Sequence, residues 1–274
     1  MHGFLQEITR KEENTMCILW QTGVPVTQRI KQIKQPRGGY IKPKQMTVTR
    51  LGDGIETLHP VENVHASLVG LAVDYLTRFM TGASARQAFH ISLMGANCVG
   101  QSELASQMVS EITGLDGHSI TRAVQLSSFD VCYRTNVMGF EVAHEIEPDL
   151  DTIENIGKMV NRAMAFFHTY GPKTMEEFTF EGGYTDTVTA GDGDFLTKDT
   201  LWDFKVSKAP VKKEHTLQIL MYWRMGLHSI HPEFEEIQYL GIYNPRLNTI
   251  SRIAVSDIPP EVIYEVDTKV IGYE

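Results

Sequence analysis

Apolar residues recur at helical spacing along the first half of the chain. After Asn63 the sequence HASLVGLAVDYLTRFM places apolar side chains three and four positions apart, which predicts a helix. Two more helical pieces are expected within residues 83–114, and another over 119–130. A longer helix is predicted over 152–170, and Gly171-Pro172 should end it because this pair breaks helices.

The pattern changes in the second half. Over residues 174–208 apolar and polar positions alternate, Thr, Phe, Tyr and Val are frequent, and GG and GDGD interrupt the run, which predicts a meander of three strands. A helix is expected over 214–227 and a strand over 236–243, with a hairpin partner over 249–255. A last short helix should begin at 258–260. The outline is a helical half followed by β-β-β-α-β.

The first 62 residues form a third region, predicted to be a basic N-terminal arm with one or two short strands. The net charge of −9 argues at first against nucleic acid as a partner. The charge is uneven, however, because the segment from Arg29 to Arg50 contains seven Lys or Arg residues, both ends included, and no acidic residue. Such a segment can bind a phosphate backbone. Alternatively, it is a solvated, partly disordered arm.

Composition and cysteine content narrow the setting of the protein. No apolar run approaches the roughly 20 residues that span a bilayer, and the first residues lack the apolar stretch of a signal peptide. Cys17, Cys98 and Cys132 are few and far apart, so no disulfide framework or CxxC metal motif is visible. We therefore expect a cytoplasmic protein with no membrane partner.

The candidate chemistry lies in the segment GDGDFLTKDTLWDFKVSK. Asp203 and Lys205 are two positions apart on an apolar strand, so their side chains should project from one face. A hairpin can bring Asp194, just after the glycine turn, beside them. The two carboxylates and the carbonyl of Phe204 would form an oxygen-rich site suited to Mg²⁺ or Mn²⁺. The Lys205 ammonium could then orient or deprotonate a water molecule.

The following helix carries two further polar side chains, Gln218 and Tyr222. They are four residues apart, share one helix face and could bind a phosphate or the lysine. Together these segments resemble the PD-(D/E)XK nuclease superfamily, and within it the RecB-like branch of phage-type exonucleases. That branch has a G-x-x-D turn, a D-x-K strand and a Q-x-x-x-Y helix in this order. Here the three motifs lie between residues 191 and 222.

The resemblance implies an α/β, restriction-endonuclease-like core, a small mixed sheet flanked by helices, with a helical N-terminal half. Residues 63–274 would form a single nuclease domain, with a helical part over 63–172 and the catalytic sheet and helix over 173–274. The implied activity is Mg²⁺-dependent hydrolysis of DNA by a metal-activated water, as an exonuclease in recombination, repair or phage DNA processing. The implied partners are DNA and either further copies of the chain or a recombination or repair protein.

Three other residues extend the resemblance. The RecB-like branch usually places a metal-contacting histidine in an early helix, where this chain has Asp74; the alternative is an exposed or capping acid. Glu181 corresponds to an acid that the family often places just before its meander, or it is a surface carboxylate at a strand end. His215 could reach DNA, although a surface histidine at the start of a helix is the simpler interpretation.

Three alternatives remain open. A catalytically silent nucleic-acid-binding or assembly module could have the same fold, but it would have no reason to retain Asp194, Asp203 and Lys205 together. An acidic interaction protein with an accidental D-x-K would show neither cation dependence nor binding of nucleic acid. A sequence-specific endonuclease is ranked below an exonuclease because no recognition domain is evident.

Overall fold

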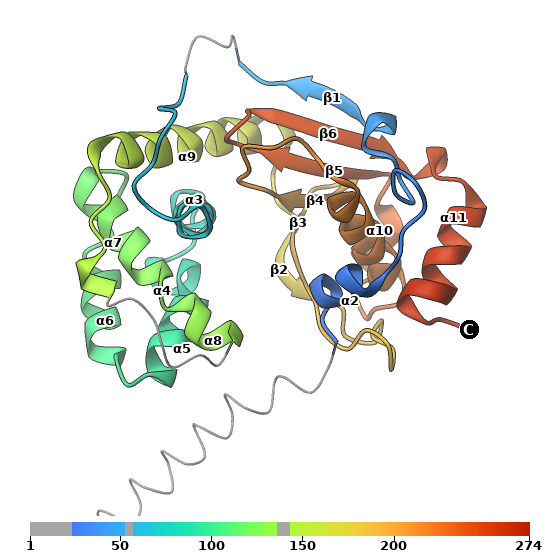
Figure 1. Ribbon diagram of the computed structural model, residues 1–274, viewed down its shortest axis with the longest axis horizontal. Helices are drawn as coiled ribbons and strands as arrows, with labels where there is room; N and C mark the ends of the chain where they lie inside the picture. Colours follow the sequence, from blue (N-terminus) through green and yellow to red (C-terminus); the bar gives the residue numbers. More distant parts are fainter. Residues whose placement is uncertain (1–23, 53–56, 136–142) are drawn as a thin grey trace, which may run out of the picture. The chain divides into compact units, whose positions relative to one another are not determined.

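The computed structural model describes residues 24–52, 57–135 and 143–274 (Figure 1). It is a mixed α/β structure in which the chain folds into two compact units. The described residues of the first unit lie within 57–164, and those of the second are 24–52 and 165–274. Residues 24–52, expected to belong to a separate arm, are thus part of the second unit.

The first unit consists of helices in the residues that the structure describes. These are α3 (Ala66–Met80), α4 (Ala85–Ala88), α5 (His90–Cys98), α6 (Ser102–Ser110), α7 (Gly117–Ser127), α8 (Asp130–Thr135), a 3-10 turn (Ala143–Glu145) and most of α9 (Leu150–Tyr170). The helices expected after Asn63, over 119–130 and over 152–170 are therefore confirmed, the last ending at Gly171-Pro172. Residues 83–114 form three helices instead of two, because Phe89 leaves helical geometry with a ψ of 22°.

Local side chains and close packing explain these helices. Asp116 caps α7, since its Oδ1 accepts a hydrogen bond from the backbone N of Ser119 at 3.0 Å. Helix α5 passes so near the start of α8 that a Cβ at Gly95 would lie 2.0 Å from the carbonyl oxygen of Phe129. Only glycine permits this approach of two backbones.

The second unit is built on a six-stranded sheet with the order β1-β6-β5-β4-β3-β2. Its elements are α2 (Val26–Gln32), a 3-10 turn (Pro43–Gln45), β1 (Thr47–Arg50), β2 (Met175–Thr179), β3 (Asp192–Leu196), β4 (Thr200–Phe204), α10 (Lys213–Leu227), a 3-10 turn (Pro232–Glu236), β5 (Tyr239–Asn244), β6 (Thr249–Ala254), a 3-10 turn (Val255–Asp257), α11 (Pro260–Glu265) and a π-helical segment (Val266–Ile271). Strands β4 and β5 are parallel and α10 connects them, while the other neighbours are antiparallel. The expected β-β-β-α-β order is confirmed.

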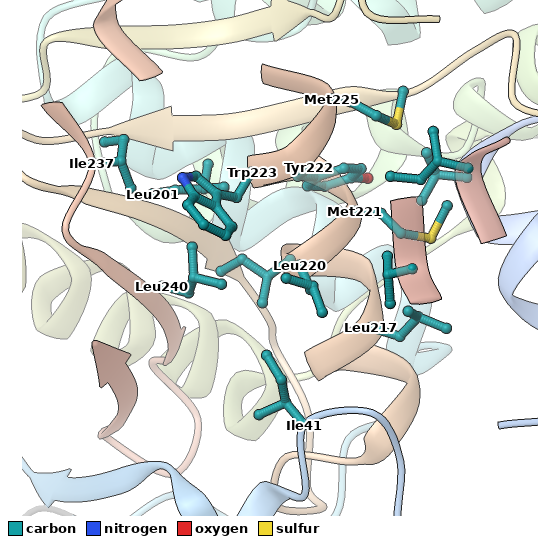
Figure 2. Packing of buried hydrophobic residues seen from close by; sticks show 14 of the residues in the cluster. Ile41, Leu201, Leu217, Leu220, Met221, Tyr222, Trp223, Met225, Ile237 and Leu240 are labelled. Atoms are coloured by element: carbon teal, nitrogen blue, oxygen red, sulfur yellow. The ribbon is translucent and has the colours of Figure 1, made fainter. Parts of the chain in front are cut away.

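The two faces of this sheet are covered by different helices. Helix α10 packs on the face that carries Leu201 and Leu240, where it forms the main hydrophobic core (Figure 2). The opposite face carries Trp202, whose ring lies 4.9 Å from that of Phe166 near the end of α9. A Cβ at Gly241 would come within 2.4 Å of the Trp202 ring, so the indole can cover the neighbouring strand only where this residue is glycine.

Residues 24–52 pack against the same core. Val26, Ile30, Ile41 and Met46 are buried in it, and Thr216 of α10 donates a hydrogen bond to the carbonyl of Ile41 at 2.6 Å. The segment forms α2 as well as the expected strand β1. The helix was not expected, because a single apolar pair four positions apart is too short a pattern to predict one. The expectations for residues 1–23 lie outside the described residues.

Candidate functional site

Strands β3 and β4 place the two motif aspartates side by side. Phe195 pairs with Trp202 and Leu196 with Leu201, so the same register puts Asp194 opposite Asp203. Cross-strand neighbours in an antiparallel pair share a face. The arrangement is held by Asp194, whose Oδ2 accepts a 2.6 Å hydrogen bond from the backbone N of Phe204. The hairpin therefore brings the carboxylates together, as the alternation predicted. The turn expected just before Asp194 is wrong, because Gly193 lies inside β3 and residues 197–199 form the hairpin turn.

Asp203 is the unusual member of this pair. Only 1% of its surface is exposed, and neither carboxylate oxygen accepts a hydrogen bond from any described residue. Lys205 Nζ lies 2.9 Å from Oδ1 and forms an ion pair by distance, although without the angles of a hydrogen bond. A buried carboxylate without donors is costly, because its lost hydration is poorly replaced. Such a group is therefore a candidate for binding a cation.

Helix α10 places the second polar pair on the same face of the sheet. Gln218 Nε2 donates a hydrogen bond to the hydroxyl of Tyr222 at 2.7 Å, so the two residues lie together as their spacing predicted. Burial raises the pKa of Tyr222 well above its ordinary value, and the charges of Asp192, Asp203 and Asp194 raise it further. The Tyr222 hydroxyl is therefore protonated and lies within the field of three carboxylates.

Asp192 is the residue of this group that the motif pattern did not single out. It is exposed at the start of β3, two positions before Asp194, and so shares its face. Among the carboxylates that raise the pKa of Tyr222, Asp192 has the largest effect. The GDGD sequence offered the signal, since both of its aspartates alternate toward the same side of a strand.

His215 lies one turn before Gln218 on α10. Its Nδ1 accepts a hydrogen bond from the backbone N of Lys212 at 3.4 Å, so the ring helps to cap the helix. Burial lowers the pKa of His215, and Lys205 and Lys212 lower it further while Asp203 opposes the shift. The neutral ring therefore carries its proton on Nε2. His215 is half-buried and not a free surface side chain.

The two other candidates, Asp74 and Glu181, lie on elements other than β3, β4 and α10. Asp74 lies on α3 in the first unit, where its carboxylate forms a two-pronged ion pair with Arg78, with Nη2 2.9 Å from Oδ2. Glu181 follows β2, and its side chain is exposed while its carbonyl accepts a hydrogen bond from Ile230.

The oxygen donors of this cluster could hold a metal ion only together with water ligands. In the described part of the chain, no group of three or more His, Cys, Asp or Glu side chains is placed to hold an ion. Mg²⁺, however, retains several waters and is commonly bound by one or two carboxylates. Asp194, Asp203 and the carbonyl of Phe204 can supply such a set, and the buried Asp203 oxygens without hydrogen-bond donors fit it.

Comparison with known proteins found no relative of this chain. The chain matches no protein-family model, no curated protein and no solved structure. Within the residues described, no helix is both long enough and apolar enough to cross a bilayer. What the structure defines is thus a mixed α/β protein whose six-stranded sheet carries a cluster of acidic side chains next to a lysine.

Proposed function

We propose that the chain is a metal-dependent deoxyribonuclease, an exonuclease that hydrolyses phosphodiester bonds. The observation that carries the proposal is Asp203, a buried carboxylate whose oxygens accept no hydrogen bond from the described residues and which lies beside Asp194 and Lys205. A protein with no use for such a group would gain stability by replacing it. The restriction-endonuclease-like identity of the sheet is part of the same proposal.

Asp194, Asp203 and the Phe204 carbonyl would hold Mg²⁺ or Mn²⁺. When bound, the ion polarises the phosphodiester and lowers the pKa of a water ligand. Lys205 is 28% exposed, so its ammonium can reach a phosphate oxygen while Asp203 holds its position. It would donate a hydrogen bond to the phosphate or to the attacking water, and its charge would offset the negative charge that develops there.

The other site residues would act by positioning. Gln218 donates a hydrogen bond to the hydroxyl oxygen of Tyr222, so the hydroxyl proton can point toward the carboxylates that raise the pKa of Tyr222. This pair would hold the scissile phosphate in position relative to the carboxylates. Neutral His215 lies near Asp203 and Lys205 and would offer its Nε2 proton as a further donor.

DNA is the proposed substrate because basic side chains lie on the same unit as the acidic cluster. Arg29 is committed to the carbonyls of Val270 and Lys269, but the remaining basic residues of the 29–50 segment are exposed. Exposed Lys and Arg side chains bind the phosphate backbone in a salt-dependent way. The unit can therefore attract a polyanion although the net charge of the chain is −9.

End-labelled linear DNA and closed-circular DNA test the proposal, each incubated with Mg²⁺, with Mn²⁺ and with EDTA. Wild type should degrade the linear substrate only with a divalent cation, and Lys205→Ala should abolish this activity. Lys198→Ala is the matched control, because Lys198 is an exposed lysine in the turn of the same hairpin. Cutting of the circle would indicate an endonuclease. Failure of wild type on both substrates would favour a binding module instead.

A further inference from the structure

The row of side chains that carries the acidic pair continues across the sheet. Register pairs Asp203 with Ile242, Ile242 with Ser251, and Ser251 with Val48 on the edge strand β1. Residues paired in this way share a face, so the row runs on the side covered by α10. Two positions further along the strands, Asn244 pairs with Thr249 in a second row on the same face.

These two rows form the floor of a cavity of about 160 Å³ next to Lys205. Its walls come from the 3-10 turn before β1, from the segment after β4 and from the turn between β5 and β6, with Pro43, Pro210, Val211 and Leu247. His215 closes the end nearest α10. Since Lys205 belongs both to the cavity and to the acidic cluster, a group bound in the cavity would lie next to the proposed scissile phosphate.

The size and lining of the cavity select a flat heteroaromatic ring. A cavity of roughly 150 Å³ accommodates a benzene-sized molecule. Most of the wall is apolar. The few polar groups in it, among them the hydroxyls of Ser251 and Thr249, could form hydrogen bonds with the edge of a heteroaromatic ring. A phosphate would need more than the single fixed cation, Lys205, that lines this space.

We propose that this cavity binds the base of the nucleotide adjacent to the scissile phosphate, withdrawn from its stack. The inference rests on the proposed nuclease function and specifies how its substrate is held. The ring of His215, whose Nδ1 accepts a hydrogen bond from the Lys212 backbone N, would donate from Nε2 to an acceptor on the base or its sugar. A strand end with an unpaired terminal base would therefore be the preferred substrate, because pairing and stacking keep a base out of the cavity.

Binding of oligonucleotides that lack one base tests this inference. Short single strands labelled at one end, each with an abasic residue at a different position, would be titrated by fluorescence anisotropy with Ca²⁺ in place of Mg²⁺. Val48→Phe would fill the cavity from its rim, since Val48 is 63% exposed and lines it. Thr49→Phe is the matched control, because the next residue of the same edge strand points to the opposite face.

We expect one abasic position to weaken binding to wild type about tenfold, in line with the cost of losing one stacked base. Val48→Phe should bind the intact strand as weakly as the abasic one, and Thr49→Phe should behave as wild type. Uniform binding of all strands, or equal behaviour of the two variants, would overturn the cavity assignment even if Mg²⁺-dependent hydrolysis is present. A positional effect without hydrolysis would support the base site and overturn the nuclease instead.

Discussion

Each of the two units contains an almost fully buried aspartate, and the two carboxylates have opposite surroundings. Asp130 in the first unit is 2% exposed and accepts hydrogen bonds from Tyr75 and Ser92, each at 2.5 Å. Asp203 in the second unit is 1% exposed, and its oxygens accept none from the described residues. The first carboxylate accepts two hydrogen bonds within the fold, whereas the second has the ion pair with Lys205 and no hydrogen bond from the described residues.

The largest effect should come from Asp203→Asn. The substitution keeps the shape of the side chain but removes the charge, so DNA hydrolysis should fall by roughly a thousandfold, the scale of losing a few kcal/mol of charge stabilisation. The unfolding free energy should change by no more than about 1 kcal/mol, because removal of the buried charge is offset by loss of its ion pair with Lys205. Initial rates and urea denaturation measure the two quantities. A clear loss of stability would mean that Asp203 is structural after all.

Asp130→Ala should give the converse result. Two buried hydroxyls lose a charged acceptor, so the unfolding free energy should fall by about 3 kcal/mol. Activity per folded molecule should stay within about twofold of wild type at temperatures well below the unfolding transition. Thermal denaturation and hydrolysis assays on the same sample would measure both. A variant as stable as wild type would show that the Tyr75 and Ser92 bonds contribute little.

Tyr222→Phe tests the positioning pair beside Asp203. Loss of the hydroxyl leaves Gln218 without its acceptor, which should cost about 1 kcal/mol of stability. Hydrolysis should slow by about tenfold if the pair holds the substrate in register. Gln218→Ala should reproduce the rate effect, and the double variant should add little to either one, because both substitutions remove the same hydrogen bond. Full additivity of the two would contradict a shared role.

A smaller effect should appear as pH dependence of stability. Burial raises the pKa of Asp130 above its ordinary value of 3.8 and outweighs the hydrogen bonds and Arg134, which lower it. The folded state then binds the proton more tightly than the unfolded chain. Proton binding by Asp130 therefore contributes fully to the unfolding free energy below pH 3.8, and this contribution is lost as pH rises through the folded-state pKa. Urea denaturation of wild type and Asp130→Asn should be measured from below pH 3.8 to above the folded-state pKa. The difference between their unfolding free energies should shrink as pH rises. A constant difference would exclude this shift.

Asp74→Asn should have the smallest effect. Its carboxylate is engaged by Arg78 on the same helix, and such partly exposed pairs contribute about 0.5 kcal/mol. We expect stability to change by no more than that and hydrolysis to stay within about threefold of wild type. The same initial-rate assay decides the matter, because a loss comparable to that of Asp203→Asn would make Asp74 a metal ligand despite its ion pair.

Much of the second unit could be predicted because its signals are local. Alternation specifies the hairpin that pairs Asp194 with Asp203, and four-residue spacing places Gln218 beside Tyr222. The features that escaped prediction depend on contacts between distant segments. The cavity needs β1 next to β6, a pairing of residues some 200 positions apart, as in Val48 with Ser251.

The Asp130 site shows the same limit in the first unit. The aspartate lies in an apolar stretch and meets Tyr75 and Ser92 only through packing of three helices, so neither its burial nor its partners could be inferred from spacing. Sequence motifs therefore identified the aspartates that a hairpin brings together. They could not distinguish a buried carboxylate with donors from one without.

Binding of Mn²⁺ to the protein tests the central claim most directly. Free Mn²⁺ would be followed by electron paramagnetic resonance during titration of wild type, Asp203→Asn and Asp199→Asn. Asp199→Asn is the control, because Asp199 lies in the turn of the same hairpin and its carboxylate is 3.4 Å from Arg252. If Asp203 holds the cation, Asp203→Asn should weaken binding by at least about tenfold while Asp199→Asn matches wild type. Equal Mn²⁺ binding by all three proteins would contradict the account.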